Sequence, residues 1–173
     1  SSIVEPALAV TQIVEGCKMS LYKFEKYKSK KENHTPDLTI LVSKSEKISK
    51  AIKIAEIVSE GAIYTKDIAN MPPNDCTPTT LANFAKNIAK KNNMKCKVIA
   101  KNELKKKGFG GITAVGQGSK NEPKLIVLEY NHGVRNEKPI VLVGKAVTFD
   151  TGGISLKPGE KMDEMKFDKC GGC

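Results

Sequence analysis

Helical spacing of apolar residues predicts three amphipathic helices in the first half of the chain. The first begins near residue 5 and ends near Gly16. The second follows Ser45, a residue type that caps helix N-termini well, and it ends at Ala69 before a Pro-Pro pair that breaks helices. The third starts at Thr77 and Pro78, because threonine is a good cap and proline suits the first helical turn.

Short apolar or alternating runs predict β-strands between and after these helices. The runs are residues 38–42, 95–100, 124–130 and 139–143, and a short lysine-rich helix is expected at 102–108. Helices that alternate with strands are typical of sheets with helices on both faces. The expected fold class is therefore α/β, as a three-layer sandwich with a mixed, largely parallel sheet.

Length and composition allow a domain of ordinary size with its own core. The chain has 173 residues, a mass of 18.8 kDa and 39% hydrophobic residues. No apolar run approaches the roughly 20 residues that span a bilayer. The first residues also lack the basic and apolar regions of a signal peptide. We therefore expect a cytoplasmic protein without a membrane partner.

The net charge of +10 and the pI near 9.3 raise the hypothesis of a nucleic-acid-binding module. Arg135 is the only arginine, although arginine is the residue best suited to bidentate phosphate and base contacts. Aromatic residues make up 5% of the chain, and tryptophan is absent, so platforms for base stacking are sparse. A solvated lysine surface explains the charge more simply, and nucleic-acid binding stays as an alternative.

The cysteines are odd in number and dispersed, which favours reduced thiols over a disulfide framework. They are Cys17, Cys76, Cys96, Cys170 and Cys173. The last two form a C-x-x-C pattern, which is found in zinc sites and redox pairs. No second C-x-x-C and no histidine pair accompanies it, so we do not assign it a function.

Polar residues 29–37 interrupt the apolar pattern and contain one proline. Before them, Leu21, Phe24 and Tyr27 alternate with lysines, as expected of a connector whose aromatic rings pack and whose charges are solvated. We therefore predict a domain boundary here, which divides the chain into residues 1–36 and 37–173.

The chemically suggestive stretch is residues 141–173. It carries Lys145, Asp150, Lys157 and Asp168 in loops and at a predicted strand end, with glycines between them. Carboxylates suit divalent cations, and two converging acids can bridge two of them. A lysine can join such a site as the neutral amine. A metal site and a solvated turn with ordinary surface charges are both compatible with this spacing.

Two motifs in this stretch resemble a known family. VGKAVTFDTGGISLKP at residues 143–158 and MDEMKFDKCGG at 162–172 are similar to the core signature of the leucyl (cytosol) aminopeptidases, which are two-metal exopeptidases of the cytoplasm. ANMPPNDCTPTTLA at residues 69–82 resembles the NxPxNxxTPxxLA segment of the same family, as an independent second match.

The resemblance implies a role for each matching side chain. Lys145 corresponds to the lysine that ligates one metal, and Asp150 to the acid that bridges both metals. Asp168 corresponds to a further acid on the metal that the lysine binds. Lys157 corresponds to the catalytic lysine that touches substrate and polarises the attacked carbonyl, and Met165 to a methionine of the substrate pocket.

The resemblance also implies the activity, cofactors and assembly. The expected reaction is release of N-terminal, leucine-like amino acids from peptides by water that two divalent cations activate. Zn²⁺ and Mn²⁺ are the expected ions, with Mg²⁺ as a further candidate, and the family assembles as homo-hexamers.

One family segment is not found, and it changes what we expect of this chain. The segment of type NTDAEGR, which supplies further metal ligands, has no match here. We therefore expect an interior piece of an aminopeptidase: residues 1–36 are the end of the N-terminal domain with its connecting helix, and 37–173 the first part of an incomplete catalytic domain. We expect this piece alone to be inactive. A scaffold that keeps the fold without the chemistry is the other hypothesis.

Overall fold

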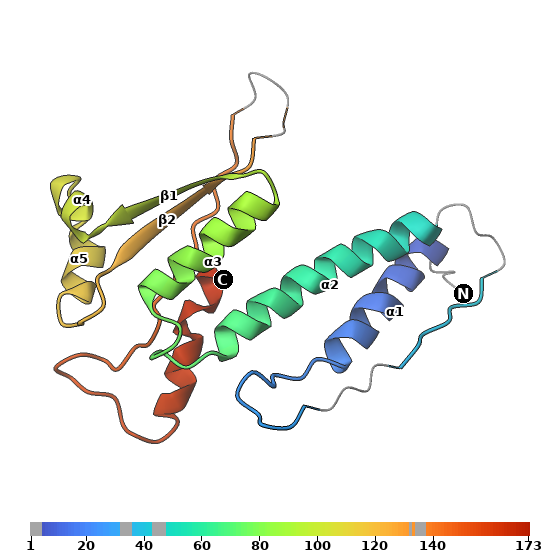
Figure 1. Ribbon diagram of the computed structural model, residues 1–173, viewed down its shortest axis with the longest axis horizontal. Coiled ribbons are helices and arrows are strands. Elements are labelled where there is room, and N and C mark those ends of the chain that lie inside the picture. The colour runs from blue at the N-terminus through green and yellow to red at the C-terminus, as the bar shows by residue number, and fades with distance from the viewer. Residues whose placement is uncertain (1–4, 32–35, 43–47, 132, 134–137) are drawn as a thin grey trace. The chain divides into compact units, whose positions relative to one another are not determined.

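The computed structural model describes residues 5–31, 36–42, 48–131, 133 and 138–173. The chain divides into two compact units, Ser1–Asp67 and Ile68–Cys173, which are described separately (Figure 1). The predicted boundary after residue 36 concerns the domains of a longer protein and stays a prediction.

The first unit consists of helix α1, Pro6–Ser20, and most of helix α2, Ile48–Asn70. Their contact is a small apolar core of Val10, Val14, Ile48 and Ala55. α1 continues four residues beyond the predicted end at Gly16, because one exposed glycine costs a helix only about 1 kcal/mol. α2 ends one residue after the predicted Ala69. The predicted cap Ser45 lies outside the described residues.

The second unit begins with the last residues of α2 and continues into helix α3, Pro78–Lys91. The Thr77 hydroxyl accepts a hydrogen bond from the Thr80 amide at 3.2 Å, and Pro78 occupies the first turn. The predicted cap and helix start are confirmed. The side chains that α3 buries are Leu81, Ala82 and Ala89.

The sheet consists of strand β1, Lys95–Ala100, and strand β2, Lys124–Glu129, which pair in antiparallel register from Lys95 opposite Glu129 to Ala100 opposite Lys124. Helix α3 contacts both strands. Helices α4, Lys101–Lys106, and α5, Gly110–Gly116, connect the strands. Leu104 of α4 is fully buried. β1 has the predicted bounds, and β2 ends one residue before the predicted Tyr130.

The α/β class is confirmed, but the largely parallel three-layer sandwich is not. Within the described residues the sheet has two strands, and they are antiparallel. Residues 38–42 and 139–143 were predicted as strands and form none; Ile140 and Leu142 are each 91% exposed. An apolar run becomes a strand only when a neighbouring strand takes up its backbone hydrogen bonds. No described segment does so for these two runs.

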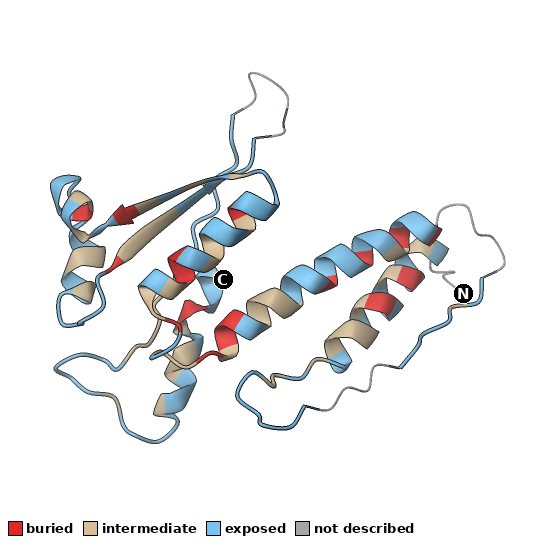
Figure 2. Ribbon diagram, in the orientation of Figure 1, coloured by how far each residue is buried: buried red, intermediate tan, exposed pale blue. Residues whose placement is uncertain are grey.

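Residues 138–161 form an irregular segment that leads into a 3₁₀ helix, η1, Met162–Gly172. Figure 2 shows no buried residue in this irregular segment. In η1, by contrast, Lys169 is buried. Among the described residues no helix is long and apolar enough to cross a membrane.

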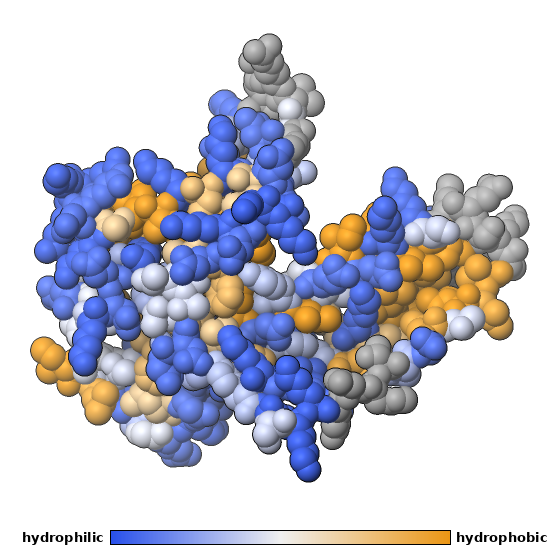
Figure 3. All heavy atoms as spheres, viewed as in Figure 1, coloured by the Kyte–Doolittle hydropathy of each residue, from blue (hydrophilic) through white to orange (hydrophobic). Residues whose placement is uncertain are grey.

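Exposed lysines cover much of the second unit. Lys90 and Lys91 end α3, and Lys105 and Lys106 end α4, all of them exposed. Figure 3 shows hydrophilic residues gathered over α4 and along α3 on the face drawn. Exposed lysines are compatible both with a solvated surface and with nucleic-acid binding, so the interpretation of the charge stays a prediction.

Candidate active site

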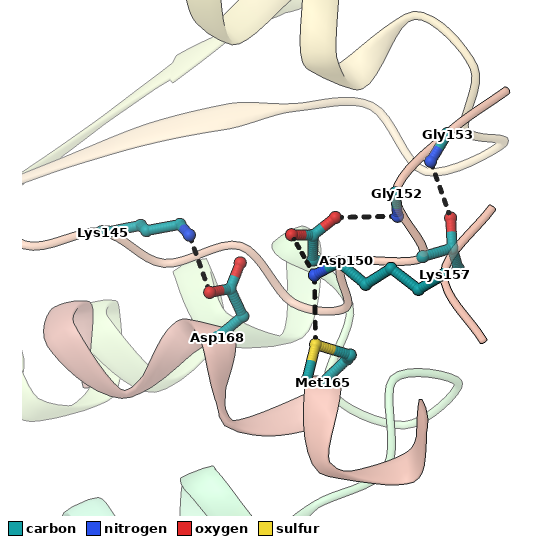
Figure 4. A network of polar contacts seen from close by, with 8 residues as sticks. Lys145, Asp150, Gly152, Gly153, Lys157, Met165 and Asp168 are labelled. Carbon is teal, nitrogen blue, oxygen red and sulfur yellow. Dashed lines mark hydrogen bonds and ion pairs between the residues drawn. The ribbon is translucent and has the colours of Figure 1, made fainter. Parts of the chain in front are cut away.

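Two segments of the second unit carry the predicted site residues. Lys145, Asp150 and Lys157 lie on the irregular segment, and Met165 and Asp168 lie on η1 (Figure 4). A 3₁₀ helix has three residues per turn, so side chains at i and i+3 share one face. Met165 and Asp168 therefore project together toward the irregular segment, and each meets a lysine there.

The first of these contacts is an ion pair between Lys145 and Asp168. Lys145 Nζ donates to Asp168 Oδ1 at 2.7 Å. This hydrogen bond raises the pKa of Lys145, partial desolvation opposes the rise, and the charges of Asp168 and Asp150 add to it. Within the described part of the chain, the other carboxylate oxygen, Asp168 Oδ2, is buried and has no hydrogen-bond partner. A buried carboxylate oxygen without a partner is costly, so this atom has a free coordination position for a cation or a donor.

The second contact is centred on Asp150. Lys157 Nζ donates to Asp150 Oδ2 at 2.7 Å and lies 3.2 Å from Met165 Sδ. The Gly152 amide donates to Asp150 Oδ1 at 2.9 Å. The Lys157 hydrogen bond and, after it, the Gly152 amide lower the pKa of Asp150 below its usual value. Asp150 is therefore held as a carboxylate, with its oxygens oriented by two donors.

Glycines allow the two segments to approach each other at backbone distance. A Cβ added at Gly144 would collide with the Gly171 carbonyl oxygen, and one added at Gly172 would lie 2.6 Å from Ala146 Cβ. Gly152 has φ +90°, a left-handed conformation that favours glycine, and a Cβ there would collide with the Ser155 carbonyl oxygen. Glycine at these positions therefore permits the bend and the close approach that bring the site residues together.

The structure thus groups the five predicted side chains as two adjoining sets. Lys145 is bonded to Asp168, whereas Asp150 is bonded to Lys157, with Met165 beside Lys157. Asp150 contributes to the electrostatic field at Lys145. The structure shows pairwise contacts among these side chains, and their metal and substrate roles stay predictions.

The donor chemistry fits part of a metal site. Lys145, Asp150 and Asp168 offer one amine and two carboxylates, and Asp168 Oδ2 has a free position. No cluster of three or more His, Cys, Asp or Glu side chains suited to a metal is found among the described residues. Two cations would therefore need ligands beyond these three residues.

Lys169 is a further residue of this region, and the sequence motifs did not point to it. Its side chain is fully buried, and its ammonium binds the backbone carbonyls of Ala69, Met71 and Lys166. The available signal was a lysine directly after Asp168, and a lysine is ordinarily expected at the surface.

A sequence profile described as "Cytosol aminopeptidase family, catalytic domain" matches residues 63–173, which is most of the chain and includes all of these site residues. The chain belongs to the cytosol aminopeptidase family. The resemblance seen in the two motifs is thereby confirmed.

Similar proteins agree with this assignment. The chain is 55% identical over 172 residues to a probable cytosol aminopeptidase of Cenarchaeum symbiosum, covering 99% of this chain and 35% of that protein. It is 45% identical over 164 residues to the cytosol aminopeptidase of Pseudomonas aeruginosa strain PAO1, covering 92% of this chain and 33% of that protein. The chain thus spans about a third of the length of these relatives.

Solved structures of the bottromycin maturation enzyme BotP have a similar fold. The structure of BotP in complex with Mn aligns with a TM-score of 0.79 at 29% identity, covering 99% of this chain and 36% of BotP. A second BotP structure aligns with a TM-score of 0.76 at 30% identity, covering 96% of this chain and 34% of BotP. The fold of this chain is therefore similar to that of about a third of a longer protein.

Proposed function

We propose that this chain is part of a metal-dependent aminopeptidase that releases N-terminal, leucine-like amino acids from peptides in the cytoplasm. We call a polypeptide that contains this chain and has the length of the relatives the whole protein. The observation that carries the proposal is the meeting of Lys145 with Asp168 and of Lys157 with Asp150, within a segment that matches the family's catalytic domain.

Lys145, Asp150 and Asp168 would hold two divalent cations, with Asp150 shared between them. Zn²⁺ and Mn²⁺ are the proposed ions, with Mg²⁺ as a further candidate, and the similarity to a Mn-containing BotP structure supports a divalent metal. Ligands bind metals in their deprotonated forms, so Lys145 must give up the proton that it shares with Asp168. When bound, the two cations polarise the peptide carbonyl and lower the pKa of an attacking water.

Lys157 would act on the substrate directly. Its ammonium is oriented by Asp150 and by Met165 Sδ, at the site where the carboxylates gather. A preorganised ammonium stabilises the negative charge that develops on a carbonyl oxygen during hydrolysis. Met165, on the same face of η1 as Asp168, would supply an apolar, adaptable wall for the side chain of the N-terminal amino acid that is released.

Completion of the fold and of the ligand set would require the rest of the whole protein. We propose that the exposed run at residues 140–143 pairs within a larger, largely parallel sheet and that the whole protein forms the three-layer sandwich and a homo-hexamer. An exposed apolar run of this kind is a common site of pairing or association. The proposal assigns no role to nucleic acid or membranes.

The decisive experiment compares hydrolysis of a leucine anilide by three forms of the whole protein in Mn²⁺ or Zn²⁺. The wild type should turn over and lose activity on chelation. Asp168→Asn should lose bound metal and at least about 100-fold in rate, because a ligand is removed. Asp163→Asn changes an exposed acid on the same helix and should match the wild type.

The same assay separates this proposal from its alternatives. The 173-residue chain alone should be inactive with either metal, because Lys145, Asp150 and Asp168 are too few ligands for two cations. A whole protein that is folded but shows no metal-dependent turnover would support the non-catalytic scaffold. Metal-dependent turnover by the isolated chain would contradict its assignment as an incomplete enzyme.

A further inference from the structure

Lys169 is the only charged residue classed as buried among the described residues, and its side chain is fully buried. Its ammonium donates to Ala69 O at 3.0 Å, to Met71 O at 3.0 Å and to Lys166 O at 2.6 Å. An ammonium group has three N–H donors, so these three carbonyls use all of them. Lys169 therefore has no donor left for substrate or solvent.

Burial of this charge opposes folding unless its hydrogen bonds offset the lost hydration. Its hydrogen-bond partners are neutral backbone carbonyls and not carboxylates. Burial lowers the pKa of Lys169, as expected for an ammonium removed from water. An apolar side chain would fill the same space without the cost of lost hydration. Packing alone therefore does not explain why an ammonium group is buried here.

The hydrogen bonds connect parts of the chain that are about a hundred residues apart in sequence. Ala69 is in the last turn of α2, and Met71 follows it directly, whereas Lys169 is in η1. The ammonium thus attaches one side of η1 to the start of the second unit. On another side, Gly171 and Gly172 pack at backbone distance against Gly144 and Ala146.

Asp168 lies between these two attachments. Successive residues of a 3₁₀ helix point roughly 120° apart around its axis. With Lys169 directed to the carbonyls of Ala69 and Met71, the Asp168 side chain is turned toward Lys145. A rotation of η1 about its own axis would break the Lys169 hydrogen bonds and move the Asp168 carboxylate together.

We propose that Lys169 is a positioning residue of the active site, whose buried ammonium fixes the rotation of η1 and so holds the Asp168 carboxylate at the metal position. Lys169 acts through Asp168 and does not touch the reacting atoms. This inference rests on the proposed function, because it takes Asp168 as a metal ligand.

The test uses the whole protein and Mn²⁺ as the probe. Lys169→Met puts an unbranched apolar side chain, one atom shorter, in place of the lysine and removes all three donors. Lys105→Met makes the same change at an exposed lysine of α4. Calorimetric titration of the metal-free proteins measures the Kd for Mn²⁺, and kcat and KM are measured for a leucine anilide. The thermal midpoint of the metal-free protein reports folding separately.

Lys169→Met should weaken Mn²⁺ binding about 10- to 100-fold, as loss of a supporting residue around a metal ligand does. It should lower kcat with little change in KM, and Lys105→Met should change none of these values. A lower thermal midpoint with unchanged Kd and kcat would overturn the proposal, because Lys169 would then be a purely structural buried cation.

A second variant keeps the test decisive if Lys169→Met does not fold. Lys169→Gln retains two N–H donors for the three carbonyls, so Mn²⁺ binding should weaken by an intermediate factor, and an unchanged Kd would overturn the proposal. Asp168→Asn separates this inference from the proposed function. If that variant loses Mn²⁺ and the Lys169 variants do not, only the positioning role fails; if it binds Mn²⁺ normally, the metal assignment itself fails.

Discussion

The β1–β2 sheet with α3 and the site region at residues 138–172 belong to the same compact unit, but they are held together in different ways. In the sheet, backbone hydrogen bonds define the register from Lys95 to Ala100, and α3 packs on both strands. In the site region, the described contacts between the irregular segment and η1 are the Lys145–Asp168 ion pair, the contact of Lys157 Nζ with Met165 Sδ, and close glycine contacts. Hydrogen bonds between strand backbones can form with many different side chains, whereas the contacts of the site region require particular residues.

Because of this difference, we expect the sheet and its helices to contribute mainly to stability and the site region mainly to chemistry. Lys145 and Lys157 are partly exposed, and exposed ion pairs add little to the free energy of folding. Their value is geometric, since each pair orients a carboxylate. We therefore expect changes in the sheet and its helices to lower stability with the site intact, and changes in the site region to impair chemistry with the fold intact.

The largest expected effect is on turnover, from Lys157→Met in the whole protein. The value of kcat should fall about 100- to 1000-fold, because the donor to the developing oxyanion is lost, and the thermal midpoint should stay the same. Lys120→Met, at an exposed lysine outside the site, is the control. A small loss of kcat with a large loss of thermal stability would break the distinction between the two regions.

Leu104→Ala tests whether the sheet and its helices contribute to stability without affecting the site region. Leu104 is fully buried, and its truncation should cost about 2–5 kcal/mol in the free energy of unfolding, through lost contacts and a cavity. Denaturant unfolding measures this cost, and Val115→Ala, at a residue 74% exposed, should cost much less. The Mn²⁺ affinity of the folded Leu104→Ala protein should equal that of the wild type; a weaker affinity would show that the regions are coupled.

Gly144→Ala tests whether glycine contacts align the site. The added Cβ would collide with the Gly171 carbonyl oxygen, so η1 must move relative to Lys145. We expect about a 10-fold weaker Mn²⁺ Kd by calorimetry. Gly159→Ala is the matched control, since nothing lies within 4 Å of the Cβ that it adds. Equal Kd values for the two variants would show that the close approach is not needed.

Thr77→Ala removes the cap of α3 and should cost about 1 kcal/mol in unfolding free energy, because the Thr80 amide loses its acceptor. Thr79→Ala, at an exposed position in the first turn of the same helix, controls for the loss of a threonine. Both variants should keep wild-type kcat. The prediction fails if denaturant unfolding gives both variants the same stability.

A further expected effect, confined to alkaline pH, is a pH dependence from Cys173. Burial raises the pKa of its thiol to about 11, above the ordinary value of 9.0. Between these values the unfolded chain releases the proton and the folded chain keeps it, so stability should fall as pH rises from about 9 to about 11. Cys173→Ser should flatten the plot of thermal midpoint against pH in this interval. Identical plots would show that the thiol is not shielded in the whole protein.

The sequence by itself determined the local features of this protein. β1 has its predicted bounds, and Thr77 caps α3 as predicted, because the alternation of side chains and a capping hydroxyl act within a few residues. The motifs around Lys145 and Asp168 also led to the family, since their spacing is readable in one dimension.

Only the tertiary structure decided how distant residues combine. It paired Lys145 with Asp168 and Lys157 with Asp150, and among the described residues no strand pairs with residues 140–143. It also placed the Lys169 ammonium on the carbonyls of Ala69 and Met71. Hydrophobic periodicity shows which face of a helix or strand is apolar, but not which distant backbone will contact that face. A lysine is ordinarily assigned to the surface, so the burial of Lys169 could not be predicted from the sequence.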